Sequence, residues 1–302
     1  MRAVVTGGAG FIGSHVVDAL LARGDEVTVV DNLATGKREH VPASATFVEQ
    51  DVREPFETDA EVVFHLAAQA DVRVSVEDPA FDAAVNVVGT IRVLEAARRA
   101  GAQVVLASTG GAIYGECERP AREDDVRLPL APYGTAKLAA EEYLATYNRL
   151  YGTNHVSLRY GNVFGPRQDP HGEAGVVAIF FGRLAAGSPL RVFGDGRQSR
   201  DYVYVRDIAR ATLRSAGARG GVFNVGTGRE TSVLELAELC GRAAGVDHEL
   251  VHAPPRAGEL QRSFLDTGRA ESVLGFRAET TLEDGLRATW LWLAGDGAGA
   301  AK

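Results

Sequence analysis

The stretch "VVTGGAGFIGSHVV", residues 4–17, decides the fold of this chain. It begins with β-branched residues typical of a buried strand, and it ends with the apolar spacing of a helix. Between them, Gly7, Gly10 and Gly13 form the pattern G-x-x-G-x-x-G. Glycines let a backbone approach a phosphate closely, and the N-terminus of the next helix offers free N–H groups and a positive dipole end. A strand, a glycine turn and a helix in this order predict a pyrophosphate site.

An acidic residue closes the next strand. Asp31 follows "EVTVV" (26–30) and stands 18 residues beyond Gly13. A carboxylate at this place can accept hydrogen bonds from a ribose diol, and it repels a 2′-phosphate. The pattern therefore favours NAD as the cofactor, while Lys37 and Arg38 keep NADP open as an alternative. With Asp31 in place, a purely structural tight turn is the weaker interpretation of the glycines.

Short apolar strands alternate with helices through the first half of the chain. This alternation predicts an α/β fold with a Rossmann doubly wound parallel sheet, covered by helices on both faces. The expected strands are 3–6, 26–30, 46–49, 62–66, 104–108 and 155–160. After about residue 162 the pattern changes to glycine-rich loops, a strand at 190–194 and helices at roughly 206–217, 232–244 and 281–294.

We therefore expect a Rossmann domain over residues 1–162 that binds NAD. A smaller C-terminal α/β substrate-binding cap is expected mainly over residues 163–294, with some segments returning to the first domain. The small residues of 295–302 predict a disordered tail.

Composition excludes several classes of function. The net charge of −8 over 302 residues argues against binding to nucleic acid, which needs a basic surface. No apolar run is long enough to span a bilayer, and we expect no signal peptide before the first strand. Cys117 and Cys240 stand far apart in the chain. We therefore expect a cytoplasmic protein with no metal, nucleic-acid or membrane partner.

A second motif carries acid/base chemistry. In "APYGTAKLAAEEY" (131–143), Tyr133 and Lys137 are four residues apart and share one face of the predicted helix. A free tyrosine titrates near pH 10, and a neighbouring cation favours its phenolate. A surface tyrosine and a solvated lysine are the alternative. The adjacent cofactor site favours a catalytic pair, in which Tyr133 takes a proton from a hydroxyl group of the substrate.

Together these motifs resemble the extended short-chain dehydrogenase/reductase family. The glycine spacing, "HLAAQADV" (65–72) and "YGTAK" (133–137) match it in order, and the resemblance covers nearly the whole chain. It implies NAD, with Asp51 and Val52 by the adenine and Tyr160 on the nicotinamide side. The cofactor-binding residues that we expect on this basis are Gly7, Gly10, Phe11, Ile12, Gly13, Asp31, Asn32, Asp51, Val52, Leu66, Ala67, Ala68, Gln69, Asn86, Ser108, Tyr133, Lys137 and Tyr160.

The segment "LASTGGAIYGE" (106–116) narrows the reaction. Relatives that dehydrate or decarboxylate nucleotide sugars carry acidic residues here, whereas this chain has Gly110, Gly111 and Ala112. A reaction with one acid/base group and a reversible hydride transfer, such as epimerisation at C4, is favoured. Gly110 departs from the family, because relatives usually place a Ser or Thr there. We expect Thr109 to be the catalytic hydroxyl instead, with Ser108 or a water as alternatives.

The second half resembles the UDP-glucose 4-epimerases and their kin within that family. The motifs are "RYGNVFGPR" (159–167), "VFGDGRQSRDYVYVRD" (192–207) and "PPRAGELQRSFLD" (254–266). Arginine forks suit a diphosphate because they form paired, charge-assisted bonds to its oxygens. The expected substrate-binding residues are Asn162, Arg200 and Arg256 at the diphosphate, Phe193 and Val177 at the base, and Ser263 in the sugar pocket. The small Ser263 suggests room for an N-acetyl group.

The predicted activity is that of an NAD-dependent 4-epimerase of UDP-glucose and UDP-galactose, working through a 4-keto intermediate. UDP-glucuronate is a rival substrate, because Arg73 and Arg183 could meet its carboxylate, and UDP-N-acetylhexosamines are another. An NAD(P)-dependent nucleotide-sugar reductase and a catalytically silent NAD-binding protein are the further alternatives. The resemblance implies a homodimer through helices at about 82–100 and 134–151, although these helices could equally just cover the sheet.

Overall fold

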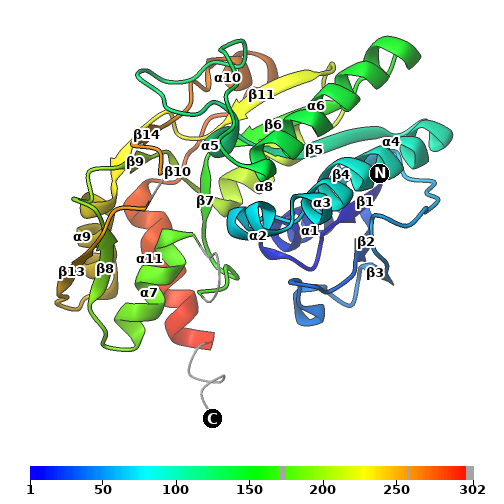
Figure 1. Cartoon of the computed structure of the whole chain (residues 1–302). Coiled ribbons are helices and arrows are strands. Elements are labelled where there is room, and N and C mark those ends of the chain that lie inside the picture. The colour runs from blue at the N-terminus through cyan, green and yellow to red at the C-terminus, as the bar shows by residue number, and fades with distance from the viewer. Residues whose placement is uncertain (171–174, 257–258, 297–302) are drawn as a thin grey trace.

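The computed structural model describes residues 1–170, 175–256 and 259–296. A seven-stranded parallel sheet forms its centre, in the order β11-β6-β5-β4-β1-β2-β3 (Figure 1). Chain order reverses between β1 and β4, so the ligand crevice of a doubly wound sheet is expected at the carboxyl ends of these strands. The predicted Rossmann sheet is confirmed. Its strands are β1 (Arg2–Thr6), β2 (Glu26–Asp31), β3 (Thr46–Glu49), β4 (Val62–His65), β5 (Gln103–Thr109), β6 (Val156–Tyr160) and β11 (Gly221–Val225).

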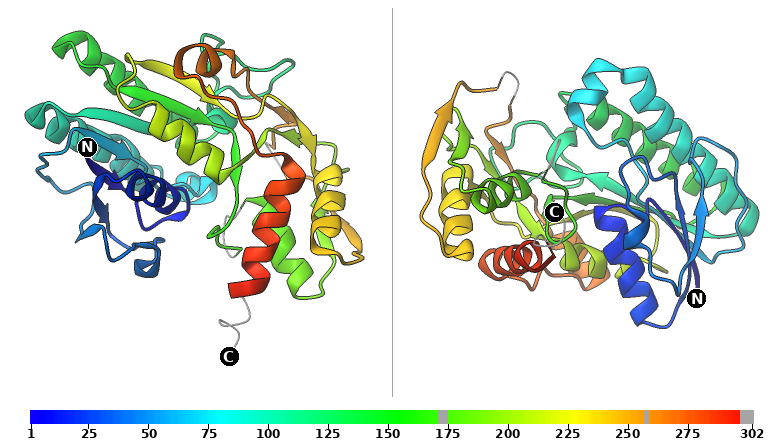
Figure 2. Two further views of the ribbon diagram at one scale, coloured as in Figure 1. Left: turned by 180° about the vertical axis from the view of Figure 1, so that it is seen from behind. Right: turned by 90° about the horizontal axis from the view of Figure 1, so that it is seen from below.

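Helices cover both faces of this sheet. Helices α1 (Phe11–Ala22) and α8 (Val205–Arg214) pack together on one face, and α4 (Gly89–Ala100) and α6 (Pro132–Tyr151) lie on the other (Figures 1 and 2). Because strand side chains alternate, Val5 joins the core under α1 while Val4 joins the core under α4. Shorter segments are η1 (Arg38–His40), α2 (Val72–Glu77), α3 (Pro79–Ala83), the π-helical η2 (Ala84–Val88) and α5 (Gly110–Ile113).

A second lobe is built from the later part of the chain. Helices α7 (Val176–Ala185), α9 (Val233–Ala244) and α11 (Leu282–Asp296) pack with the parallel strands β8 (Leu190–Phe193) and β13 (Leu250–Ala253) (Figure 1). Their apolar side chains form a core of their own, which includes Phe180, Leu236 and Leu286. Short strands stand between the lobe and the sheet: β7 (Asn162–Phe164), β9 (Ser199–Arg200), β10 (Tyr202–Tyr204), β12 (Thr231–Ser232) and β14 (Arg262–Ser263).

The chain passes between the two parts more than once. Helix α8, strand β11 and helix α10 (Gly268–Leu274) all follow residue 162, yet they contribute to the core of the parallel sheet. The sequence pattern did not predict β11, because its apolar run is short and begins and ends among glycines. Helix α11 continues to Asp296, two residues into the predicted tail, and residues 297–302 lie outside the described part of the chain. None of the described helices is long and apolar enough to cross a membrane.

Candidate active site

The three glycines of the motif have different steric surroundings; Gly7 and Gly10 precede α1, and Gly13 lies in its first turn. Gly7 has a φ of +71°, and a Cβ on it would lie 2.5 Å from the backbone nitrogen of Ala67. A Cβ on Gly13 would lie 2.1 Å from the Gly7 oxygen, whereas one on Gly10 would meet only that oxygen, at 3.2 Å. Gly10 caps α1 without a side-chain hydrogen bond. Gly7 and Gly13 therefore close the turn, and Gly10 leaves the helix N-terminus open to an anion.

Asp31 ties the end of β2 to this turn. One carboxylate oxygen accepts a hydrogen bond from Ala9 N at 2.9 Å, and the other accepts one from Leu33 N at 2.8 Å. Beside it, Asn32 donates to the carboxylate of Asp51 at 2.9 Å. Hydrogen bonds from Arg53 lower the pKa of Asp51. Polar side chains therefore gather at the carboxyl ends of β2 and β3, where the predicted adenosine half of the site lies.

Side-chain hydrogen bonds hold the loop that follows β4. Asn86, in the π-helical η2, accepts a hydrogen bond from Gln69 N at 3.1 Å and donates to Gln69 O at 2.9 Å. The side-chain amides of both residues donate to one oxygen of the buried Asp82, at 2.9 and 3.0 Å. Sequence reasoning missed Asp82, although its place four residues before Asn86 on one helix face was a usable signal. Of the other predicted residues here, Ala67 N donates to Thr6 Oγ1 and Leu66 N donates to Thr6 O.

Several predicted residues lie where the lobe meets the sheet or at the crevice. Phe11 and Ile12, in the first turn of α1, pack against the lobe core. Val52 is buried, and it lies 3.0 Å from where a Cβ on Gly89 would stand. Ala68 is partly exposed in the loop after β4.

Tyr133 and Lys137 lie in the first two turns of α6, which begins at Pro132. The buried ammonium of Lys137 donates to Ala107 O at 3.0 Å, and burial lowers the pKa of Lys137 to about 8. Burial, with Asp82 as the second cause, raises the pKa of Tyr133 to about 12. The sequence predicted the opposite direction for Tyr133. The largest cause is desolvation of the phenol, which spacing along a helix does not reveal.

The hydroxyls at the end of β5 have different surroundings. A Cβ on Gly111 would lie 3.4 Å from Asn162 Oδ1 and 4.0 Å from Thr109 Oγ1, so these two polar groups border the same space. The Oγ of Ser108 is buried and has no hydrogen-bond partner among the described residues. Of the two candidates, Thr109 faces the predicted substrate residue.

Tyr160 ends β6, and its side chain is buried. Its phenol is hydrogen-bonded to Thr212 Oγ1 of α8 at 2.7 Å, and burial raises its pKa. The ring belongs to the core between the sheet and α8. Side chains alternate along a strand, so only the Tyr160 backbone, at the carboxyl end of β6, can face the cofactor.

A buried ion pair holds α6 against the sheet. Arg159 of β6 and Glu141 of α6 approach to 2.6 Å, with side chains 1% and 3% exposed. Arg159 also donates to the Tyr114 hydroxyl at 2.7 Å, and Tyr114 donates to Asn224 at 2.7 Å. Glu141 lies one helical turn beyond Lys137. Sequence reasoning missed this network, because its members come from four separate elements.

The two predicted arginines, Arg200 and Arg256, each contact another side chain in the lobe part of the chain. The Arg256 guanidinium stacks 4.0 Å from the ring centre of Phe193, the ring expected at the base. Arg200 donates to Ser199 O at 2.8 Å, and its guanidinium lies 4.0 Å from Glu259. These contacts restrict the positions of the two guanidinium groups.

Val177 and Ser263 are both buried. Val177 belongs to the core of the lobe, so only its backbone, in the first turn of α7, can lie at a base. Ser263 is 3% exposed and pairs with Arg200 between β14 and β9. The rival carboxylate ligand Arg183 donates its Nε to Pro189 O, which holds it at the end of α7.

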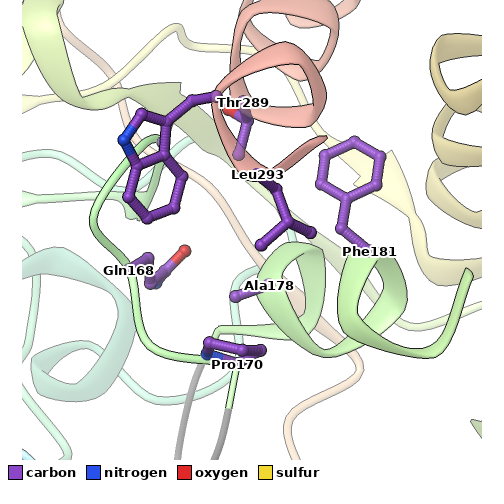
Figure 3. A pocket seen from close by; sticks show the side chains of 8 residues that line it. Gln168, Pro170, Ala178, Phe181, Thr289 and Leu293 are labelled. Carbon is purple, nitrogen blue, oxygen red and sulfur yellow. The ribbon is translucent and has the colours of Figure 1, made fainter. Parts of the chain in front are cut away.

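A small cavity lies in the lobe, away from these residues. Gln168, Pro170, Ala178, Phe181, Thr289 and Leu293 line it, between α7, α11 and the loop that precedes α7 (Figure 3). No predicted site residue lines this cavity. Within the described ranges, no group of His, Cys, Asp and Glu side chains could hold a metal ion.

Comparison with known proteins adds an independent finding. A family model described as the NAD dependent epimerase/dehydratase family matches residues 3–226. The chain is similar to the UDP-glucose 4-epimerase of Mycolicibacterium smegmatis, with 47% identity over 96% of this chain and 97% of that protein. It is also similar to a UDP-glucose 4-epimerase structure from Thermotoga maritima with UDP-glucose, at 45% identity, coverage of 98% and 99% and a TM-score of 0.93. A Thermus thermophilus UDP-glucose 4-epimerase solved with NAD is 47% identical, with coverage of 98% and 99% and a TM-score of 0.91.

Proposed function

Because the chain belongs to the NAD-dependent epimerase/dehydratase family, we propose that it is an NAD-dependent 4-epimerase that interconverts UDP-glucose and UDP-galactose. The family resemblance expected from the sequence is confirmed, since the family model spans the whole parallel sheet. The observation that carries the proposal is the placement of Tyr133 and Lys137 on α6 beside the carboxyl ends of β4 and β5, with no acidic side chain in the 108–115 segment.

The crevice fits NAD. The α1 N-terminus has no side-chain cap and no acidic residue in its first turn, which suits a pyrophosphate. Asp31 and the loop held by Asn86 would hold the ribose and the nicotinamide half. Arg38 stacks 4.6 Å from the ring centre of Phe47, so it is not poised for a 2′-phosphate. When bound, NAD supplies a hydride acceptor for C4 and a positive ring that stabilises the Tyr133 phenolate.

In this proposal Tyr133 accepts the proton of the sugar 4-hydroxyl and returns it after the 4-keto sugar has presented its other face. Lys137, held by Ala107 O, supplies positive charge beside the phenol. Thr109 hydrogen-bonds the reacting oxygen, because its hydroxyl borders the same space as Asn162. The proton and the hydride both return to the sugar, so no cofactor is consumed.

Arg200 and Arg256 bind the diphosphate in this proposal, and Phe193 contacts the base. UDP-glucuronate is the weaker candidate, because Arg183 donates its Nε to Pro189 O and the Arg73 guanidinium lies 3.6 Å from the carboxylate of Asp71. A UDP-N-acetylhexosamine is the second candidate, because residue 263, which we expect in the sugar pocket, is a serine with a small side chain.

We further infer a cytoplasmic homodimer. Both cysteines are buried free thiols, as expected in a reducing compartment. Val88 of η2 and Tyr143 of α6 are 45% and 43% exposed, and their two elements pack against each other. Sedimentation equilibrium tests the assembly: a dimer mass that Tyr143→Glu reduces to a monomer supports this face, and a wild-type monomer contradicts it.

The activity is tested by incubating the purified protein, without added cofactor, with UDP-glucose, UDP-glucuronate or UDP-N-acetylglucosamine. Chromatography resolves the C4 epimers, and absorbance follows reduced nicotinamide. We expect UDP-galactose to form from UDP-glucose without net reduced cofactor. Net turnover of the cofactor would indicate a reductase. No conversion of any sugar would overturn the proposal and favour the silent NAD-binding alternative.

A further inference from the structure

The space beside Gly110 is already filled. Gly110 opens α5 directly after Thr109. A Cβ on Gly110 would lie 2.6 and 2.7 Å from the two Cδ atoms of Leu265 and 3.1 Å from its Cγ. Carbon atoms pack best about 3.5 to 4.0 Å apart, so no side chain fits at position 110 while Leu265 keeps its place.

Leu265 is held in that place from several sides. Its side chain is 1% exposed and packs with Tyr114, Cys117, Ala121 and Phe264. The flanking backbone is bridged to Ala121, because Ala121 N donates to Phe264 O at 2.9 Å and Asp266 N donates to Ala121 O at 2.8 Å.

The consequence concerns the hydroxyl that meets the substrate. With position 110 closed, Ser108 and Thr109 are the hydroxyls at the end of β5. Thr109 borders the space beside Asn162, and the Ser108 hydroxyl is buried. We propose that Leu265 is a positioning residue: it fills the side-chain space of position 110 and so makes Thr109 the hydroxyl that contacts the reacting sugar oxygen. This inference rests on the proposed 4-epimerase activity.

A double-mutant cycle tests the packing part. Gly110→Ser should lower the melting temperature by about 5 °C, and Leu265→Ala should lower it as well, because each disturbs a buried contact. The melting temperature of the double variant should fall by clearly less than the sum of the two single decreases, because the smaller side chain at position 265 leaves room for the serine. Gly221→Ser is the matched control. It lies at the start of β11, where a Cβ meets only Phe223 ring atoms at 3.7 Å. Its effect should simply add to that of Leu265→Ala.

Measurements of kcat test which hydroxyl contacts the reacting sugar oxygen. Thr109→Ala should lower kcat about 100-fold in the native background. In the Gly110→Ser/Leu265→Ala background the same change should cost less than about threefold, because the hydroxyl of the introduced serine replaces the lost one. If Leu265 had a purely structural role, Thr109→Ala would lower kcat by the same factor in both backgrounds. An equal cost of Thr109→Ala in both backgrounds, or Gly110→Ser melting like Gly221→Ser, overturns the inference. If no UDP-sugar is converted, the proposed function and the positioning role are both wrong. The melting temperatures then still test whether Leu265 fills the side-chain space at position 110.

Discussion

The glycine turn after β1 and the tyrosine face of α6, made by Tyr133 and Lys137, both lie at the carboxyl ends of sheet strands, but they are built differently. The glycine turn depends partly on neighbours close in sequence, since Gly13 packs on Gly7, although Gly7 also lies against Ala67 of the loop after β4. The tyrosine face depends on distant partners. Lys137 bonds Ala107, 30 residues away, and Tyr114 bonds Asn224, 110 residues away.

This difference explains which part of the candidate site can be recognised from the sequence. A turn closed by steric contact between nearby glycines leaves a spacing pattern, because only glycine satisfies it. A catalytic face assembled by folding leaves residue types at unrelated positions. The following experiments probe the two regions in order of decreasing expected effect.

The largest effect is expected at the tyrosine face itself. Tyr133→Phe removes the proton acceptor without changing ring volume, so kcat should fall about 1,000-fold or more. Bound NAD, measured by its release on denaturation, should stay at the native level. Tyr143→Phe, on the exposed side of the same helix, is the matched control and should keep native kcat. Retention of more than about a tenth of kcat by Tyr133→Phe would remove the phenol from the proposed chemistry.

The next effect tests the long-range anchor of that face. Arg159→Met leaves the Glu141 carboxylate buried without its partner, which should cost about 3–5 kcal/mol of unfolding free energy. Urea denaturation measures the loss. The double variant Arg159→Met/Glu141→Leu removes both charges and should recover most of it. A double variant as unstable as the single one would show that packing, rather than the ion pair, anchors α6.

The glycine turn provides its own matched pair. Gly13→Ala places a Cβ 2.1 Å from the Gly7 oxygen, and we expect a loss of about 2–3 kcal/mol of stability, because backbone must move. Gly10→Ala meets only one atom, at 3.2 Å, so it should change stability by less than about 1 kcal/mol but weaken NAD binding about tenfold. Calorimetric NAD titration and urea denaturation separate the two. Equal destabilisation by both would contradict the division of roles.

The smallest effect is a pH dependence at Lys137. Burial lowers its pKa from 10.5 to about 8, so its positive charge is present below pH 8 and is lost above it. We therefore expect kcat to decline above about pH 8. The unfolded chain still holds this proton between pH 8 and 10.5, so the contribution of Lys137 to folding stability rises with pH in that window. A kcat profile that stays flat to about pH 10 would show that the charge of Lys137 is not needed.

The amino-acid sequence by itself determined the parallel sheet, the glycine turn after β1 and the shared helix face of Tyr133 and Lys137. Each of these follows from steric or periodic rules that act over a few residues: φ above zero at Gly7, alternation in β1, and four-residue spacing in α6. Sequence reasoning also identified Gly110 as a departure, but it could not say what fills the space there.

Only the tertiary structure decided the environment of the pair. The burial that raises the pKa of Tyr133, the core position of the Tyr160 ring and the Arg159–Glu141 pair all depend on segments that meet after folding. Leu265 stands 155 residues from Gly110, and no local sequence pattern at either position predicts their contact. Desolvation and side-chain packing depend on every neighbour in space, whereas a motif records only the neighbours along the chain.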